Sequence, residues 1–143
     1  MRPMICSALC LAGMAGSTAA EGFLPWQDRA AVARGAEVYA GHCASCHGVA
    51  LEGQPGWRSP GPDGLLPAPP HDASGHTWHH QDELLFRITK YGTAAIVGGG
   101  YQSAMIGFGD VLSDEDIIAA LAYIKSTWPP RVRAMHDRVN AGG

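Results

Sequence analysis

Five consecutive residues, Cys43-Ala44-Ser45-Cys46-His47, constrain this 143-residue chain more than any other feature of its sequence. Residues three and four apart lie on the same face of a helix, so both thiols and the imidazole would share one helical turn. Two thiols on one turn can bond the two vinyl groups on one side of a porphyrin, while the next residue directs its imidazole at the iron. The Cys-x-x-Cys-His spacing therefore predicts covalent attachment of one c-type haem, with His47 as an axial ligand.

Two other kinds of site also use a Cys-x-x-Cys pair. A dithiol redox site is expected near a βαβ pattern, which this sequence does not contain. A zinc site needs further ligands at ordered spacing, but the only other cysteines, Cys6 and Cys10, lie in the first ten residues. Six further histidines are spread along the chain. Haem attachment is therefore the favoured interpretation, with a dithiol or a zinc site as the alternatives.

Residues 1–20 have the pattern of a secretory signal peptide. Arg2 precedes an apolar run over residues 5–16, and the small residues Ser17-Thr18-Ala19-Ala20 follow. We expect cleavage after Ala20 or one residue earlier. The apolar run is short for a membrane span, and an uncleaved anchor is the alternative. The sequence therefore predicts a periplasmic or otherwise exported protein whose mature chain has no transmembrane span.

The rest of the chain is long enough for one compact domain of modest size. The formal net charge of the full chain is −3, and no basic patch suggests binding to nucleic acid. We assign residues 21–130 to one domain and residues 131–143 to a polar C-terminal tail. The tail ends in two glycines, and we expect it to be loose.

The spacing of apolar residues predicts three main helices. The first spans about residues 28–42 and leads into the cysteine motif. The second spans about residues 81–91 and stops at Gly92. The third begins after Ser113, a good N-cap residue, and ends before Pro129-Pro130.

Two long segments lie between these helices. Residues 48–80 are rich in glycine and proline, and residues 93–111 are rich in glycine. A loop of this length is unusual in a compact domain unless it surrounds a buried cofactor. No strand pattern is strong enough to predict a sheet. We therefore expect an all-α fold in which three main helices and long loops wrap around one covalently attached haem.

The arrangement resembles the class I cytochrome c family from about Arg29 to Trp128. The supporting segments, besides the cysteine motif, are Gly35-Ala36-Glu37-Val38-Tyr39, Met105-Ile106-Gly107-Phe108-Gly109 and Leu121-Ala122-Tyr123-Ile124. The resemblance implies the cytochrome c fold, in which the first and last helices cross near the haem. Gly35 would permit that close approach, with Tyr39 and Tyr123 packed around it. It also implies a single-haem, exported bacterial electron carrier rather than an enzyme.

The resemblance implies that Met105 is the second axial ligand, because this residue lies in the loop before the last helix. The predicted mature chain has one other methionine, Met135, which lies in the polar tail. The family pattern places a proline after the ligand methionine, whereas this chain has Ile106 there. A thioether remains available at Met105 despite that departure.

Three histidines beside Trp78 are the rival ligands: His76, His79 and His80. They can instead hydrogen-bond a haem propionate or lie in solvent. We expect Trp78 to close the haem edge, with its N–H donating to a propionate. We expect His42 and His136 to be exposed. The resemblance also implies that one proline of Leu66-Pro67-Ala68-Pro69-Pro70 offers the carbonyl that orients His47.

With two axial ligands the iron has no open position, and the expected chemistry is one-electron cycling between Fe(II) and Fe(III). We expect a monomer that docks briefly with redox partner proteins at the haem edge. Two alternatives remain. The chain can be the haem-bearing subunit of a larger respiratory oxidoreductase, or a ligand-binding haem protein if Met105 is not on the iron.

Overall fold

The computed structural model describes residues 22–142, and this part of the chain is helical. In chain order its helices are α1 (Arg29–His42), α2 (Ala44–His47), the 3₁₀ helix η1 (Thr77–His79), α3 (Asp82–Tyr91), α4 (Thr93–Val97), α5 (Asp114–Thr127) and α6 (Pro130–Asn140). Between residues 22 and 142 extended backbone pairs only at an isolated antiparallel bridge, Gly92 with Ile106. The predicted all-α fold with three main helices is confirmed. The predicted signal peptide lies outside the described residues.

Local signals in the sequence set the ends of the three main helices. The Asp28 carboxylate accepts a hydrogen bond from the Ala30 amide at 2.8 Å and begins α1. The Ser113 hydroxyl accepts from the Asp116 amide at 3.1 Å and begins α5. Gly92 ends α3 with a φ of +85°, a conformation that glycine adopts without strain. The three helices begin and end within one residue of the predicted limits.

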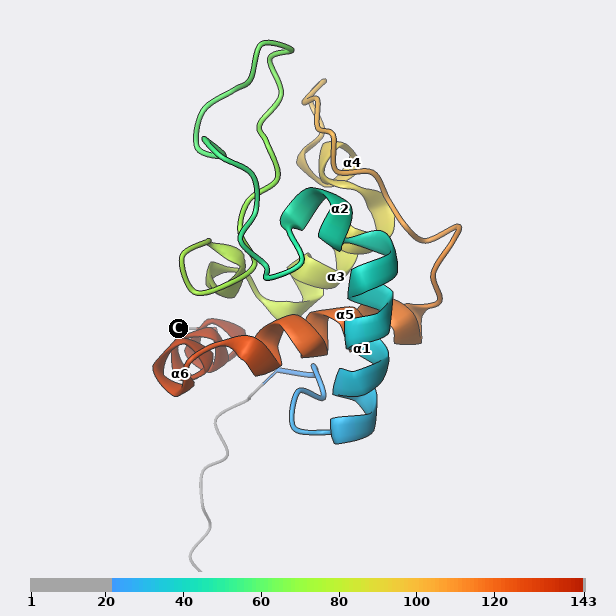
Figure 1. The fold of residues 1–143 in the computed structure, drawn as a ribbon, viewed down its shortest axis with the longest axis vertical. Helices are drawn as coiled ribbons and strands as arrows, with labels where there is room; N and C mark the ends of the chain where they lie inside the picture. Colours follow the sequence, from blue (N-terminus) through green and yellow to red (C-terminus); the bar gives the residue numbers. More distant parts are fainter. Residues whose placement is uncertain (1–21, 143) are drawn as a thin grey trace, which may run out of the picture.

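Helix α1 crosses α5 at close range (Figure 1). At the crossing Gly35 is buried, and a Cβ built there would collide with the backbone carbonyl of Ala119 and lie 2.9 Å from the Cβ of Tyr123. The rings of Tyr39 and Tyr123 pack beside the crossing with centroids 5.5 Å apart. The predicted roles of these glycine and tyrosine residues in the helix crossing are confirmed.

The apolar core forms around α5, which is the most deeply buried helix. Its inward residues are less than one-tenth exposed and are Ile117, Leu121, Ile124 and, just after the helix, Trp128. Tyr39 of α1 and Leu85 of α3 join them from two sides. These contacts hold the two longest helices and α3 together, so α5 supports the rest of the fold.

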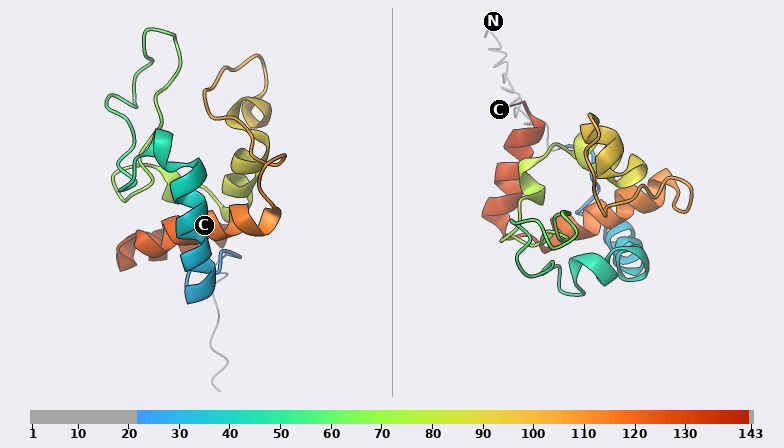
Figure 2. Two further views of the ribbon diagram at one scale, coloured as in Figure 1. Left: turned by 45° about the vertical axis from the view of Figure 1, so that its right-hand side comes forward. Right: turned by 90° about the horizontal axis from the view of Figure 1, so that it is seen from above.

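Two arms of the chain stand side by side on α5 (Figure 2). One arm holds α2 and the irregular segment 48–76, and the other holds α3, α4 and the segment 98–112. The irregular course of residues 48–76 agrees with the sequence analysis. Helix α4, by contrast, lies in a segment predicted to be a loop, because a five-residue helix is too short to give a clear periodic pattern.

The prediction of a loose C-terminal tail is wrong. Residues 130–140 form α6, which begins with Pro130 at its first position and packs against η1. The prediction that His136 is exposed is also wrong, because this side chain is fully buried. Its Nε2 lies 2.9 Å from the His80 carbonyl oxygen and 3.3 Å from a carboxylate oxygen of Asp82. Figure 1 shows α6 folded back beside the end of α5.

Asp82, at the start of α3, ties α6 to the first residues of the described chain. Its carboxylate accepts hydrogen bonds from the amides of Phe23 at 2.7 Å and Leu24 at 3.1 Å. The Asn140 side chain donates to the same carboxylate at 3.2 Å and accepts from the Asp82 amide at 2.8 Å. Both ends of the described chain therefore meet at one buried carboxylate. No helix between residues 22 and 142 is long and apolar enough to cross a bilayer.

Candidate haem-attachment site

The cysteine motif forms the turn that follows α1. The amides of Cys46 and His47 donate to the Cys43 carbonyl at 3.1 and 2.9 Å, so all three residues lie on one helical turn as predicted. Neither cysteine is in a disulfide; Cys43 is half-buried, whereas Cys46 is exposed. Burial, followed by the neighbouring Cys46, raises the pKa of the Cys43 thiol to about 11. Two reduced sulfur atoms are therefore available side by side for thioether bonds.

His47 is held in one orientation by a backbone carbonyl from the opposite side of the loop. Its Nδ1 lies 2.8 Å from the Pro69 carbonyl oxygen, which can only accept, so Nδ1 carries the proton. Nε2 is then the nitrogen with a free electron pair, and among the described residues no hydrogen bond reaches it. Burial lowers the pKa of His47 despite the opposing effect of the Pro69 bond, which favours the neutral imidazole that a metal requires. The sequence had left open which proline of segment 66–70 supplies this carbonyl.

His71 covers one face of the His47 ring, a contact that no sequence motif predicts. The two imidazoles are stacked with centroids 3.9 Å apart and planes 29° from parallel. Burial, followed by nearby His47 and His76, lowers the pKa of His71 well below 6.5. The only sequence signal for this contact is the position of His71 two residues after Pro69. That signal has value only once Pro69 is known to bond His47.

Met105 lies on the arm that faces α2, and its backbone is fixed at two points. Its amide donates to the Ser103 hydroxyl at 3.1 Å, and its carbonyl accepts from the Thr93 amide at 3.3 Å. The next residue, Ile106, forms the bridge with Gly92. The half-buried side chain of Met105 thus belongs to a segment pinned to the end of α3 and the start of α4. Its position on the iron stays a prediction.

Trp78 lies in η1, and its indole N–H donates to the Ala73 carbonyl at 3.4 Å, a long hydrogen bond. The ring stacks on His79 with centroids 3.6 Å apart. His76 instead stacks on Trp57, with centroids 5.3 Å apart. The aromatic rings thus form two separate stacked pairs, Trp78 with His79 and Trp57 with His76. The expected contact of Trp78 with a propionate stays a prediction. His42, as predicted, is exposed.

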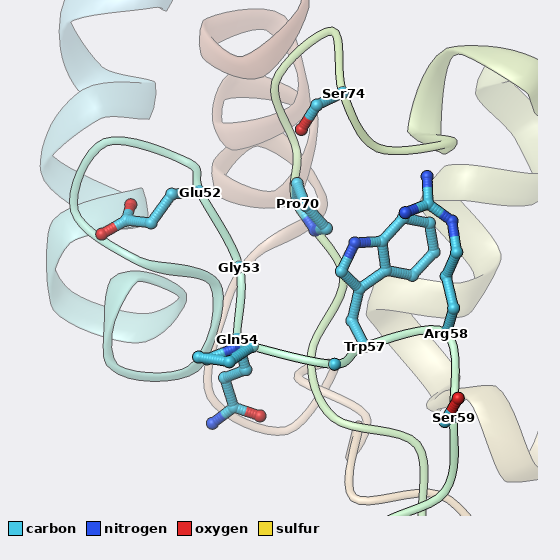
Figure 3. Close-up of a pocket in the computed structure, with 10 residues that line it drawn as sticks. Glu52, Gly53, Gln54, Trp57, Arg58, Ser59, Pro70 and Ser74 are labelled. Atoms are coloured by element: carbon cyan, nitrogen blue, oxygen red, sulfur yellow. The ribbon is translucent and has the colours of Figure 1, made fainter.

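A surface hollow lies along the long loop rather than at the cysteine turn (Figure 3). Its volume is about 490 Å³, and its wall includes Trp57 with the Arg58 guanidinium 4.1 Å from the ring centroid. A second hollow of about 270 Å³ reaches Pro67 and Pro69. Neither hollow is lined by His47 or Met105. The features that mark the haem site are the cysteine turn and the Pro69 carbonyl that bonds His47.

The donor set suits a covalently attached haem. Two adjacent free thiols, one neutral imidazole with its Nε2 unbonded, and a carbonyl that fixes its tautomer are the groups that such a cofactor needs. A structural zinc site fits less well. No three His, Cys, Asp or Glu side chains in the described part of the chain are gathered to hold a metal ion. The arrangement can therefore bind an iron porphyrin and fix one of its axial ligands.

The family model described as cytochrome c matches residues 32–128, which is more than half of the chain. The match includes the cysteine turn, Trp78 and Met105, and it leaves α6 and residues 22–31 outside. No curated protein and no solved structure matches the chain.

Proposed function

The chain belongs to the cytochrome c family of haem-binding electron-transfer proteins, and we propose that it carries single electrons through one haem joined to Cys43 and Cys46, with His47 and Met105 as the axial ligands. Bound haem supplies a reversible couple between Fe(II) and Fe(III). We place the chain with the exported, single-haem class I members of the family. It serves as a carrier and not as an enzyme.

One observation carries this proposal, the 2.8 Å contact between His47 Nδ1 and the Pro69 carbonyl oxygen beside the two free thiols. The carbonyl keeps the proton on Nδ1 and so leaves the electron pair of Nε2 available to the iron. A histidine that served only to fill the core would not need this fixed tautomer. A dithiol site would not need the histidine at all.

Met105 as the second ligand is supported by its place on the opposite arm and by its fixed backbone. The hydrogen bonds at Ser103 and Thr93 and the bridge at Ile106 limit how far the segment can move. A soft thioether in a restrained position stabilises ferrous iron and raises the reduction potential. It also blocks the position at which a small ligand would bind. Retained ligands at both positions keep rearrangement small during electron transfer.

We propose that electrons enter and leave near α2, where a partner can approach the attachment turn. Cys46 is exposed there, and Val49, which follows two residues after His47, is 82 % exposed. A small apolar contact surface suits the brief encounters of redox proteins. We expect a monomer that meets its donor and acceptor proteins in the periplasm or elsewhere outside the cytoplasm. The signal-like residues 1–20 support that compartment.

The first experiment is to produce the full chain in a host that exports and matures c-type cytochromes. We expect a coloured protein with haem that survives denaturation, no free thiol at Cys43 or Cys46, and low-spin spectra in both redox states. The reduced protein should not bind carbon monoxide. A folded but colourless product with both thiols free would overturn the whole proposal. Co-purification with a second subunit would instead identify a component of a larger oxidoreductase.

The second experiment tests the Met105 ligand. In Met105→Ala the haem should remain attached, the reduced protein should bind carbon monoxide, and the reduction potential should fall. Met135→Ala is the matched control, because it removes a thioether from α6, and its spectrum and potential should match those of the unmodified protein. An unchanged spectrum and potential in Met105→Ala would exclude this residue from the iron. Carbon monoxide binding by the unmodified protein would favour a ligand-binding function.

A further inference from the structure

We infer that His71 is a positioning residue for the axial imidazole, stacking on His47 to set the plane of its ring; this inference rests on the haem-binding function proposed above. The Pro69 carbonyl anchors only one edge of that ring, at Nδ1. A single hydrogen bond of 2.8 Å tolerates rocking of the ring about the Nδ1–oxygen direction. The face-on contact with His71, at 3.9 Å between centroids, opposes that motion.

Four contacts hold His71 itself in place. Its Nδ1 lies 2.9 Å from the Thr77 hydroxyl, which fixes the ring edge. The indole N–H of Trp128 donates to its carbonyl at 2.7 Å, and its own amide donates to the Leu51 carbonyl at 2.8 Å. The edge of Tyr39 lies against the imidazole, with centroids 6.1 Å apart. A ring fixed at backbone and side chain can restrain its neighbour, whereas a mobile surface ring cannot.

The surroundings are more elaborate than simple filling of space requires. An aliphatic side chain at residue 71 would fill the same space without needing Thr77, which is itself 5 % exposed. Trp128 adds a link to the end of α5, the central helix of the core. His71 thus connects the rigid core, through its backbone, to the axial ligand, through its ring.

The orientation of an axial imidazole plane affects the electronic asymmetry of low-spin ferric iron, so this role has a spectroscopic readout. The test uses the full-length, haem-loaded protein and compares His71→Leu, His71→Phe and Thr77→Val. His42→Leu is the control, because it removes an exposed histidine whose ring lies against Phe108. The readouts are the frozen-solution electron paramagnetic resonance spectrum and the proton NMR shifts of the haem methyl groups.

We expect the low-spin signal of His71→Leu to broaden and its largest g value to shift, with a changed spread of methyl shifts. His71→Phe restores a flat ring and should return both readouts towards those of the unmodified protein. Thr77→Val keeps the shape at residue 77 but removes the hydrogen bond, so it should shift them in the same direction as His71→Leu. His42→Leu should leave them unchanged. A role in packing alone would lower stability without this pattern.

The inference is overturned if His71→Leu and Thr77→Val keep their haem and give the same spectra as the unmodified protein. If His71→Leu does not retain haem, Thr77→Val decides alone, and its unchanged spectrum overturns the inference. Failure of the proposed function looks different. In that case the unmodified protein itself lacks low-spin haem with histidine ligation, before any variant is compared.

Discussion

At Gly35 the backbones of α1 and α5 approach so closely that an added side chain has no space. A Cβ there would meet the carbonyl group of Ala119, which belongs to a rigid helix and cannot rotate away. Gly41 lies in the same helix, and a Cβ there meets no described atom within 4 Å beyond its immediate chain surroundings. The two glycines thus have opposite steric surroundings in one helix.

We predict that Gly35→Ala lowers the free energy of unfolding by roughly 1–3 kcal/mol, because α1 and α5 must separate. Gly41→Ala should leave it unchanged or raise it by up to about 1 kcal/mol through better helix propensity. Denaturant unfolding of the haem-loaded variants measures both effects. Equal stabilities of the two variants would contradict the steric reason given for Gly35.

The sequence predicted the residues of the site that a short motif specifies, but not those that the tertiary fold brings to it. Cys43, Cys46 and His47 are neighbours in the chain, so their shared turn follows from helix geometry. Pro69 was indistinguishable from the other prolines of its segment, because only the path of the loop selects one carbonyl. His71 was missed for the same reason, since no spacing rule links it to His47.

At the scale of elements, helix ends were predictable where one side chain caps the backbone. Ser113 accepts from the Asp116 amide at 3.1 Å and donates to its carboxylate at 2.9 Å. We predict that Ser113→Ala lowers the free energy of unfolding by about 1 kcal/mol, because an amide at the start of α5 loses its acceptor. Ser113→Thr retains a hydroxyl and should lose less. Thermal unfolding at constant pH measures the difference, and identical losses would contradict the capping role.

Helix α6 was not predicted, although one of its signals was visible. Pro129-Pro130 was interpreted as the end of α5, but a proline at a first helical position also suits the start of a new helix. The remaining residues are polar and give no wide apolar stripe. Their helix is stabilised by two buried side chains, Val132 and His136, and by hydrogen bonds to His80, just after η1, and to Asp82 of α3. The buried and half-buried residues Val132, Met135, His136 and Val139 do follow helical spacing, but one of the four is a histidine and the pattern covers only two turns.

His136 makes stability depend on pH. Burial first, and then the Lys125 ammonium on α5, lowers its pKa below 6.5, against the attraction of Asp82 on α3 and Asp137 on α6. As the pH falls below 6.5 the unfolded chain therefore takes up a proton before the folded one does. The contribution of the neutral, buried His136 is present above that pH and is lost on acidification, at no more than about 1.4 kcal/mol per pH unit.

We predict that the free energy of unfolding falls between pH 7.5 and pH 5.5, and that it falls less in His136→Gln. The variant keeps a hydrogen-bonding side chain but cannot titrate in this range. Its absolute stability can differ from that of the unmodified protein, so the comparison uses the change with pH in each protein. Equal changes in the two proteins would show that His136 does not titrate on unfolding.

At the scale of the whole molecule, the two arms differ from the helical base in how their backbones are held. Helices α1 and α5 carry continuous internal hydrogen bonds and pack on each other, whereas residues 48–76 and 98–112 depend on scattered turns. An attached haem would contact both arms, which lie side by side above α5 (Figure 2). The base and the arms should therefore respond differently to its loss.

We predict that a Cys43→Ser, Cys46→Ser double variant, which cannot form thioethers, loses amide protection mainly in the arms. Hydrogen exchange should accelerate by a larger factor in residues 48–76 and 98–112 than in α1 and α5. Mass spectrometry of peptides from the full-length protein gives the factors directly. A uniform acceleration over all segments would mean that base and arms unfold as one unit.

The first residues of the described chain and the end of α6 meet at Asp82, so a segment attached before residue 22 or after residue 142 would leave the fold at one place. The amides of Phe23 and Leu24 and the side chain of Asn140 converge on that carboxylate, on the α6 side of the fold. Figure 1 shows α2 well removed from that side. A lipid tether or a second domain joined before residue 22 or after residue 142 would therefore lie on the side away from the attachment turn. The fold therefore suits a freely diffusing protein and equally a protein anchored to a membrane or to a larger complex.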